Sequence, residues 1–179
     1  MRIISGKARG RRLRTLEGND VRPTTDKVKE AIFSIIQFDL PGSVFLDLFS
    51  GSGQMGIEAL SRDAKFAYFV DSSRASVAVT NENLEAVGFS DCSKVYLMDS
   101  LSFLRSTSNT FDVALLDPPY NKGLLEEVLP LLEPKMSERG IVLCEHPEKE
   151  ILPDEVGRLV KKKEYSYGKI GVTLYTVKE

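Results

Sequence analysis

The chain has 179 residues, about the length of one domain, and a chain of this size buries enough surface to fold without a disulfide or a metal. Its hydrophobic content of 42% and charged content of 28% are typical of globular proteins and exclude disorder, collagen and coiled coil. The formal net charge is only -2, no apolar run approaches the roughly 18 residues of a membrane-spanning helix, and two cysteines with one histidine are too few for a zinc site or a disulfide framework.

The small net charge hides an uneven distribution, because residues 1–14 carry six basic side chains and no acidic one. Two strand-like pieces, residues 2–5 and 11–16, flank Gly6 and Gly10 and predict a basic hairpin. A basic extension on an acidic body points to an anionic partner. A solvated tail and a targeting peptide are the alternatives, although the segment lacks the apolar stretch of a signal peptide. The six cations are Arg2, Lys7, Arg9, Arg11, Arg12 and Arg14.

The remaining chain alternates between helical and strand-like patterns. Apolar residues recur at helical spacing behind a threonine cap at residues 25–37, which predicts an amphipathic helix. Strands are predicted at residues 44–48, 66–70, 94–98, 111–116 and 140–144, and further helices at 54–62, 74–87, 100–106 and 121–133. This alternation is typical of a parallel sheet with helices on both faces. A period of two at residues 158–167 and 170–177 predicts a closing antiparallel pair. We therefore expect an α/β domain at residues 24–179 behind a basic extension at residues 1–23.

The first predicted strand runs into a glycine-rich loop, where a GxGxxG pattern opens the next helix. In a doubly wound sheet, ligands bind at the carboxyl ends of the strands. Asp71 ends the second strand 20 residues after Gly51, where an acid can accept hydrogen bonds from the hydroxyls of a ribose. Asp47 would repel a pyrophosphate but suits the ammonium and sulfonium of S-adenosylmethionine. The pattern thus favours a nucleoside cofactor, with a glycine turn that binds no ligand as the alternative.

The third and fourth predicted strands also end in acids. Asp99 is placed to accept a hydrogen bond from an adenine amino group, and the fourth strand ends in Asp117-Pro118-Pro119-Tyr120. An exocyclic amine is a poor nucleophile because its lone pair is delocalised into the base. Hydrogen bonds to the Asp117 carboxylate and to the Pro118 carbonyl would favour a pyramidal nitrogen whose lone pair can attack, and Tyr120 can stack on the base for about 1 to 3 kcal/mol. A rigid turn leaving the sheet is the alternative.

Taken together, these features resemble class I S-adenosylmethionine-dependent methyltransferases and, more narrowly, the small-subunit ribosomal RNA guanine-N2 methyltransferase D family. The resemblance covers nearly the whole chain and is carried by residues 1–13, Leu16, residues 22–33, 47–53, 56–62, 117–120 and Tyr167-Gly168. It implies a Rossmann-like, mostly parallel sheet with an antiparallel C-terminal hairpin and S-adenosylmethionine as cofactor. The implied activity is methylation of the N2 amine of a guanine in small-subunit (16S) ribosomal RNA, either free or in an assembling 30S particle.

The resemblance also assigns roles to individual residues. Asp117, Pro118, Pro119 and Tyr120 would hold the guanine amine as the catalytic group. The implied cofactor site consists of Arg22, Pro23, Thr24, Asp47, Phe49, Gly51, Ser52, Gly53, Asp71, Ser72, Asp99, Ser100 and Asp117. The six cations of the extension would bind RNA phosphates and position a flipped-out base. The chain departs from the family at Asp71, where a glutamate is more frequent, and at Asp63, where a glycine is expected.

Three other functions share parts of this pattern. A DNA or RNA adenine-N6 methyltransferase shares Asp-Pro-Pro-Tyr, an NAD-binding oxidoreductase shares GxGxxG, and a ribosome-assembly factor could bind RNA on the same fold without catalysis. Because the tetrapeptide accepts hydrogen bonds from any exocyclic amine, the choice of guanine depends on the resemblance. We expect a cytoplasmic monomer that needs neither a membrane nor a metal, with His146 in a surface loop and Lys161 to Lys163 on a solvated face.

Overall fold

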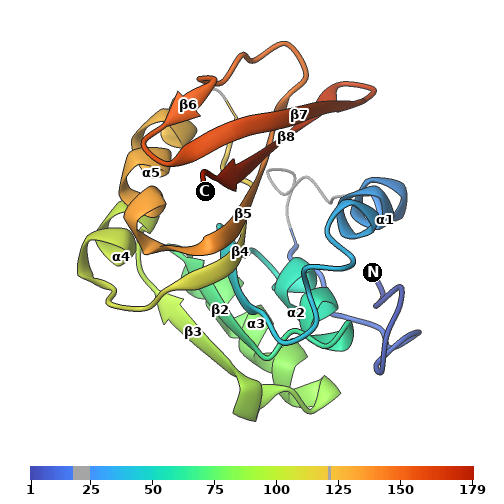
Figure 1. Ribbon diagram of the computed structural model, residues 1–179. Helices are drawn as coiled ribbons and strands as arrows, with labels where there is room; N and C mark the ends of the chain where they lie inside the picture. The colour runs from blue at the N-terminus through green and yellow to red at the C-terminus, as the bar shows by residue number, and fades with distance from the viewer. Residues whose placement is uncertain (18–24, 121) are drawn as a thin grey trace.

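A single mixed sheet organises the molecule. The computed structural model describes residues 1–17, 25–120 and 122–179. Within these residues, eight strands form one sheet in the order β3-β2-β1-β4-β5-β8-β7-β6 (Figure 1). The strands from β3 to β5 in this order are parallel, whereas β8, β7 and β6 are antiparallel to their neighbours. The strands are β1 (Val44–Leu48), β2 (Phe66–Asp71), β3 (Ser93–Leu97), β4 (Phe111–Leu116), β5 (Met136–Pro147), β6 (Glu155–Val156), β7 (Leu159–Tyr167) and β8 (Ile170–Val177).

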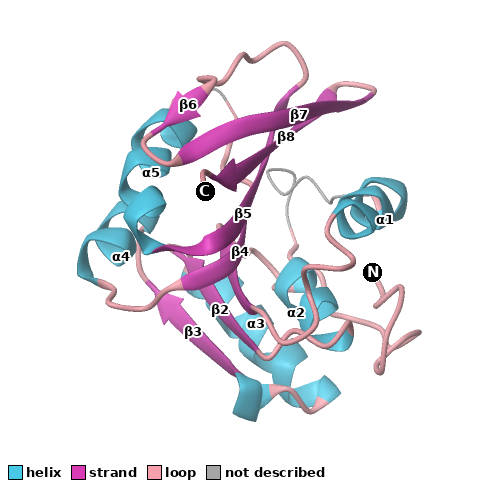
Figure 2. Cartoon of the chain, viewed as in Figure 1, coloured by secondary structure: helices cyan, strands magenta, loops and turns pink. Residues whose placement is uncertain are grey.

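Helices cover both faces of the sheet (Figure 2). They are α1 (Asp26–Ile35), α2 (Gln54–Ser61), α3 (Arg74–Val87), α4 (Ser100–Ser106) and α5 (Leu124–Leu132), with 3-10 turns at Ser90–Cys92 and Glu133–Lys135. Successive strand residues face opposite sides, so Phe45 packs into one apolar cluster with α1, α2 and α3, and Leu46 packs into a second cluster with α4 and α5. The predicted Rossmann-like α/β fold is therefore confirmed, including its antiparallel C-terminal pair.

Local signals place the first helix. The side chain of Thr25 accepts a hydrogen bond from the Val28 amide and caps the N-terminus of α1. Val28 and Ile32 are buried on the face of the helix that packs onto the core. The helix ends at Ile35, earlier than the predicted residue 37. The predicted threonine cap and the apolar face are both confirmed.

The C-terminal strands extend further than the sequence pattern indicated. β5 begins at Met136 rather than at residue 140 and continues to Pro147. His146 is therefore a strand residue and is only 4% exposed. Its ring Nε2 lies 2.7 Å from the Thr173 hydroxyl. The expectation of a surface-loop histidine was wrong, because β8 pairs with β5 as far as Pro147 and covers this position.

The leading segment folds back on itself as a short antiparallel pair rather than as two full strands. Arg2 and Arg12 make a single antiparallel bridge, and no longer ladder is present among residues 1–17. Around this bridge Ile3 donates to the Arg11 carbonyl and Leu13 to the Met1 carbonyl, both at 2.9 Å. The backbone amides of Ile4 and Ser5 bond to the Glu58 carboxylate of α2. Gly6 allows this close approach, since a Cβ there would lie 1.9 Å from the Ser61 carbonyl oxygen.

A buried ionic network fixes this segment to α1 and α2. Lys29 of α1 and Glu58 of α2 are fully buried, and the Lys29 Nζ lies 3.2 Å from the Glu58 Oε1. The Lys29 ammonium also donates to the Arg2 carbonyl, and the Arg62 guanidinium donates to the Glu58 Oε2 at 3.2 Å. Burial lowers the pKa of Lys29, whereas the charge of Glu58 opposes that shift. The carboxylate of Glu58 thus joins three segments that are distant in sequence.

No helix in the described parts of the chain is long and apolar enough to cross a membrane. The same residues contain no group of three or more histidine, cysteine or acidic side chains arranged to hold a metal ion.

Candidate functional site

A cavity of about 680 Å³ opens at the carboxyl ends of the parallel strands. This volume lies within the range of about 300 to 1,000 Å³ that is usual for ligand pockets. Residues at the ends of β1, β2, β4 and β5, in the turn after β3 and at the start of α4 contribute to its wall. Those that the sequence pattern assigned to the site are Phe49, Gly51, Asp71, Ser72, Asp99, Ser100, Asp117, Pro118, Pro119 and Tyr120. The predicted Arg22, Pro23 and Thr24 lie outside the described residues.

The glycine loop has an unusual backbone. Phe49 directly follows β1 with a φ of 71°, a left-handed conformation that costs energy for a residue with a large side chain. Gly53 also has a positive φ, and a Cβ there would lie 2.8 Å from the Cγ2 of Thr80. The Thr80 hydroxyl donates to the Gly51 carbonyl at 2.8 Å, so α3 holds the loop in place. These contacts give the loop a defined shape on the cavity wall.

Asp71 links the loop to the end of β2. Its Oδ2 accepts a hydrogen bond from the Gly51 amide and its Oδ1 accepts one from the Ser73 amide, both at 2.9 Å. A carboxylate has about four acceptor positions, so each oxygen can still accept a hydrogen bond from a ligand hydroxyl. Asp71 therefore fixes the loop and still has acceptor positions that face the cavity wall.

Asp47 lies behind the loop and is not among the residues that line the cavity. Asp47 is 2% exposed, and its Oδ2 accepts a hydrogen bond from the Gly56 amide at 2.9 Å. The pKa of Asp47 is raised to about 8, chiefly by burial and also by the charges of Asp117 and Asp71, against the lowering effect of the Gly56 hydrogen bond. A pKa of about 8 leaves Asp47 mostly protonated at neutral pH unless a cation lies near it. Ser52 and Gly53 also lie off the cavity wall.

Asp99 caps the helix that follows β3. Its Oδ1 accepts a hydrogen bond from the Ser102 amide at 2.9 Å. Hydrogen bonding from Ser102 lowers the pKa of Asp99, and since the carboxyl group is exposed it remains ionised at neutral pH. A ring amino group that entered this end of the cavity would find a permanent acceptor. Ser100, at the first position of α4, lines the cavity beside it.

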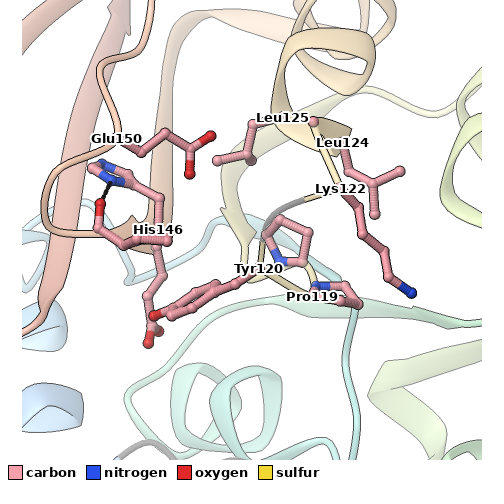
Figure 3. Close-up of a pocket in the computed structure, with 11 residues that line it drawn as sticks. Pro119, Tyr120, Lys122, Leu124, Leu125, His146 and Glu150 are labelled. Atoms are coloured by element: carbon pink, nitrogen blue, oxygen red, sulfur yellow. Dashed lines mark hydrogen bonds between the residues drawn. The ribbon is translucent and has the colours of Figure 1, made fainter.

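The Asp-Pro-Pro-Tyr segment separates the large cavity from a small hollow of about 10 Å³. Pro118, Pro119, Tyr120 and Glu145 line both spaces. Figure 3 shows the ring of Tyr120 between Pro119 and His146, while Lys122 extends away from them. An aromatic ring, an acidic side chain and a proline carbonyl thus meet at the end of β4, the combination that the sequence predicted for binding an exocyclic amine.

The six basic residues of the leading segment lie outside the cavity, and several already contact the body of the protein. Arg14 pairs with Glu82, and the Arg11 guanidinium donates to the Ala86 carbonyl. Lys7 lies over the ring of Phe89, and Arg2 is 3.8 Å from Asp26. No side-chain contact is recorded for Arg9 or Arg12 within the described part of the chain. The segment nevertheless ends at the cavity, because Leu16 belongs to its wall.

Sequence reasoning missed several residues of the cavity. The sequence pattern assigned no role to Glu145, although this residue directly follows Cys144, which pairs with Leu116 at the end of β4. That register is a tertiary feature, so no local motif marks this acid. The remaining unassigned wall residues are Val70, Ser76, Met98, Leu101, Lys122 and Leu124. Of the three lysines on β7, Lys162 and Lys163 are exposed as expected, whereas Lys161 is half-buried and pairs with Asp154 and Glu164.

The sheet order and the cavity at the ends of β1 to β5 define a class I, Rossmann-like methyltransferase fold. The solved structure of yhhF from Escherichia coli superposes with a TM-score of 0.87 at 30% identity, over 99% of this chain and 98% of that chain. A family described as Conserved hypothetical protein 95 matches residues 1–176, and the chain belongs to it.

Two curated relatives match over nearly the full length. YlbH of Bacillus subtilis is 38% identical over 180 residues, covering 98% of each chain. The protein named Ribosomal RNA small subunit methyltransferase D of Escherichia coli is 32% identical over 177 residues, covering 98% of this chain and 89% of its own length. The predicted resemblance to the methyltransferase D family is confirmed.

Proposed function

We propose that the chain transfers a methyl group from S-adenosylmethionine to the exocyclic N2 amine of a guanine in small-subunit ribosomal RNA. One observation carries the proposal: Asp-Pro-Pro-Tyr lies on the wall of a 680 Å³ cavity that also contains Asp71 and Asp99. The names of relatives such as methyltransferase D of Escherichia coli support ribosomal RNA as the substrate. The choice of guanine depends on the family resemblance.

The cavity suits this cofactor in size and charge. Asp71 would accept hydrogen bonds from the ribose hydroxyls, and Asp99 would accept one from the adenine amino group. Asp47 lies behind the glycine loop near the proposed methionine end, and the ammonium and sulfonium of the bound cofactor would favour its ionised form. When bound, S-adenosylmethionine supplies a methyl group that is already activated by the sulfonium.

The protein then has to present the amine and receive its proton. The Asp117 carboxylate accepts one N–H of the amine and the Pro118 carbonyl accepts the other, which turns the nitrogen lone pair out of conjugation with the ring. Tyr120 stacks on the base and fixes its plane. As the amine is methylated it loses one proton, which the Asp117 carboxylate can accept. Proximity and electrostatics supply the rate, so we propose that no metal takes part and that chelators leave turnover unchanged.

We propose that the leading segment binds RNA phosphates near the cavity. We count five cations for RNA, because Arg14 forms a close ion pair with Glu82, whereas the exposed Arg2 lies 3.8 Å from Asp26 and can turn to a phosphate. If each displaces one counterion from single-stranded RNA, the logarithm of affinity falls with the logarithm of salt concentration at a slope of about -3.5. A slope near zero would exclude the segment from RNA binding.

The deciding experiment is labelled-methyl transfer to unmethylated small-subunit particles and to naked RNA, followed by mass analysis of the nucleosides. We expect N2-methylguanosine with S-adenosylmethionine as donor. Asp117→Ala should lower turnover by at least about 100-fold while cofactor binding persists, whereas Glu127→Ala on the exposed face of α5 should have no effect. Selective binding of NAD, or full turnover by the Asp117 variant, would overturn the proposal.

A cytoplasmic location and a monomeric state also belong to this proposal. The cytoplasmic location follows from the substrate, because ribosomal subunits assemble in that compartment. A single molar mass of one chain in light scattering, unchanged over a wide range of protein concentration, would support the monomer.

A further inference from the structure

Glu145 is a buried carboxylate directly beside Asp-Pro-Pro-Tyr. It is 4% exposed and lines both the large cavity and the small hollow. Leu116 of β4 pairs with Cys144 of β5, so Asp117 and Glu145 follow side by side on neighbouring parallel strands. Such strands lie about 4.8 Å apart. On its other side Glu145 pairs with Val172 of β8, and this pairing fixes its backbone within the sheet.

The position of this acid matters because Asp117 and the Pro118 carbonyl accept hydrogen bonds from any exocyclic amine. The atom next to the amine distinguishes the bases. In guanine the neighbouring ring nitrogen N1 carries a hydrogen, whereas N1 of adenine and N3 of cytosine carry a lone pair. An ionised carboxylate can only accept hydrogen bonds. A carboxylate beside the amine site therefore attracts guanine and repels the other two bases.

The sheet order leaves one candidate among the acids of the cavity wall. Asp71 ends β2 and Asp99 follows β3, and both strands lie on the far side of β1, whereas Glu145 lies near the carboxyl end of β5, the neighbour of β4. We infer that Glu145 selects guanine by accepting the hydrogen bond of the ring N1–H, while Asp117 and Pro118 hold the amine. This inference rests on the proposed function.

The same contact assists the reaction. A carboxylate that accepts the N1 hydrogen bond draws that proton away from the ring and increases the electron density on the amine nitrogen. A base without the N1 hydrogen would instead leave a buried carboxylate facing a lone pair. Sites built to hydrogen-bond a substrate group reject analogues that lack it by about 10⁴- to 10⁵-fold. Because this cavity is open to solvent, we expect a smaller preference, of about 100-fold or more.

The test uses 2-aminopurine, which keeps the amine of guanine but has a lone pair on N1. Small-subunit particles are reconstituted with RNA that carries either guanine or 2-aminopurine at the position that the wild-type protein methylates. We expect the wild-type protein to prefer guanine by about 100-fold or more in kcat/KM. In Glu145→Gln the side-chain amide can donate to the bare N1, so the preference should fall to about tenfold or less. An unchanged preference would overturn the inference.

Two further variants separate selection from folding. Glu145→Asp keeps an acceptor-only side chain and should retain the guanine preference at a reduced rate. Glu150→Gln changes an acid that lines only the small hollow, and it should retain both the preference and the rate. Cofactor affinity should stay within about threefold of wild type in all three variants.

Failure of the proposed function would look different. A wild-type protein that methylates no RNA would refute the proposed function itself, and one that methylates adenine or cytosine would refute the role of Glu145 as a guanine selector. An active, guanine-specific protein whose Glu145→Gln variant keeps full preference would refute only the role of Glu145. If the Gln variant does not fold, loss of preference by the folded Asp variant would likewise count against the inference.

Discussion

The buried pair of Lys29 and Glu58 carries the attachment of the leading segment, and its removal can be measured. Both side chains are fully buried, and the Glu58 carboxylate accepts hydrogen bonds from Lys29, Arg62 and the amides of Ile4 and Ser5. Glu58→Gln preserves the shape of the side chain but removes its charge. The Lys29 ammonium then remains buried without its partner.

The structure sets the size of the effect. Removing one member of a buried ion pair costs about 3 to 5 kcal/mol, so Glu58→Gln should lower the free energy of unfolding by this amount. Lys29→Met should cost less, about 1 to 3 kcal/mol, because Arg62 still neutralises the carboxylate. In the double variant the buried ammonium is gone, and the charge that loses its partner is that of Arg62, whose side chain is 18% exposed and can reach water. We expect the double variant to be at least about 2 kcal/mol more stable than the sum of the single effects predicts.

Urea denaturation followed by circular dichroism measures all three variants, and hydrogen exchange of the Ile4 and Ser5 amides reports on the segment itself. Glu58→Gln should speed exchange at both amides and weaken RNA binding while sparing cofactor binding. The matched control is Glu82→Gln, which breaks an exposed pair with Arg14 and should cost less than about 1 kcal/mol. Additive single effects, within about 0.5 kcal/mol, would refute the ionic origin of the coupling.

The remaining predictions concern the glycine loop and the end of α2. The pKa of Asp47 is raised to about 8, chiefly by burial, and a cationic cofactor favours the ionised carboxylate. Cofactor affinity should therefore rise between pH 6 and 8, by at most tenfold per pH unit. Asp47→Asn should flatten this profile in calorimetric titrations. Gly56→Ala should cost about 1 to 3 kcal/mol in urea unfolding, since its Cβ would lie 2.3 Å from the buried ring of Phe69; an unchanged midpoint would contradict the tight packing. Asp63→Gly should raise stability by about 0.5 to 1 kcal/mol, because Asp63 has a φ of 74°; a lower thermal midpoint would show that its side chain compensates for the strain.

Much of the fold could be predicted from local patterns. The strands at Val44–Leu48 and Phe111–Leu116 and the helix at Arg74–Val87 match the predicted ranges, since each contains a continuous apolar run or helical spacing between clear end signals. The glycine expected at position 63 is also a local signal, because the backbone just after the end of α2 is left-handed at this residue. Where the sequence encodes structure within about ten residues, the pattern was sufficient.

Tertiary contacts decided the features that the pattern missed. The leading segment pairs with itself only around Arg2 and Arg12, and its amides at Ile4 and Ala8 bond to Glu58 and Ser61 of α2, which no local pattern indicates. His146 is buried through pairing with β8, which begins more than twenty residues later in the chain. The order of the strands likewise places Glu145 beside Asp117, although no motif connects them.

The acids at the carboxyl edge of the sheet explain why this site favours ligands that carry positive charge or offer several hydrogen-bond donors. Two carboxylates about 5 Å apart repel each other by about 3 kcal/mol at an effective dielectric constant of 20, and Asp117 and Asp71 both raise the pKa of Asp47. A ligand with an ammonium and a sulfonium relieves this repulsion, and a base that offers donors to Asp117 and Glu145 relieves it further. The repulsion therefore lowers the folding stability of the protein with an empty site and makes the binding free energy of both proposed ligands more favourable. Loss of stability at a functional site is common in proteins. The buried pair of Lys29 and Glu58 has the opposite effect, because its charges neutralise each other and it stabilises the attachment of the basic segment.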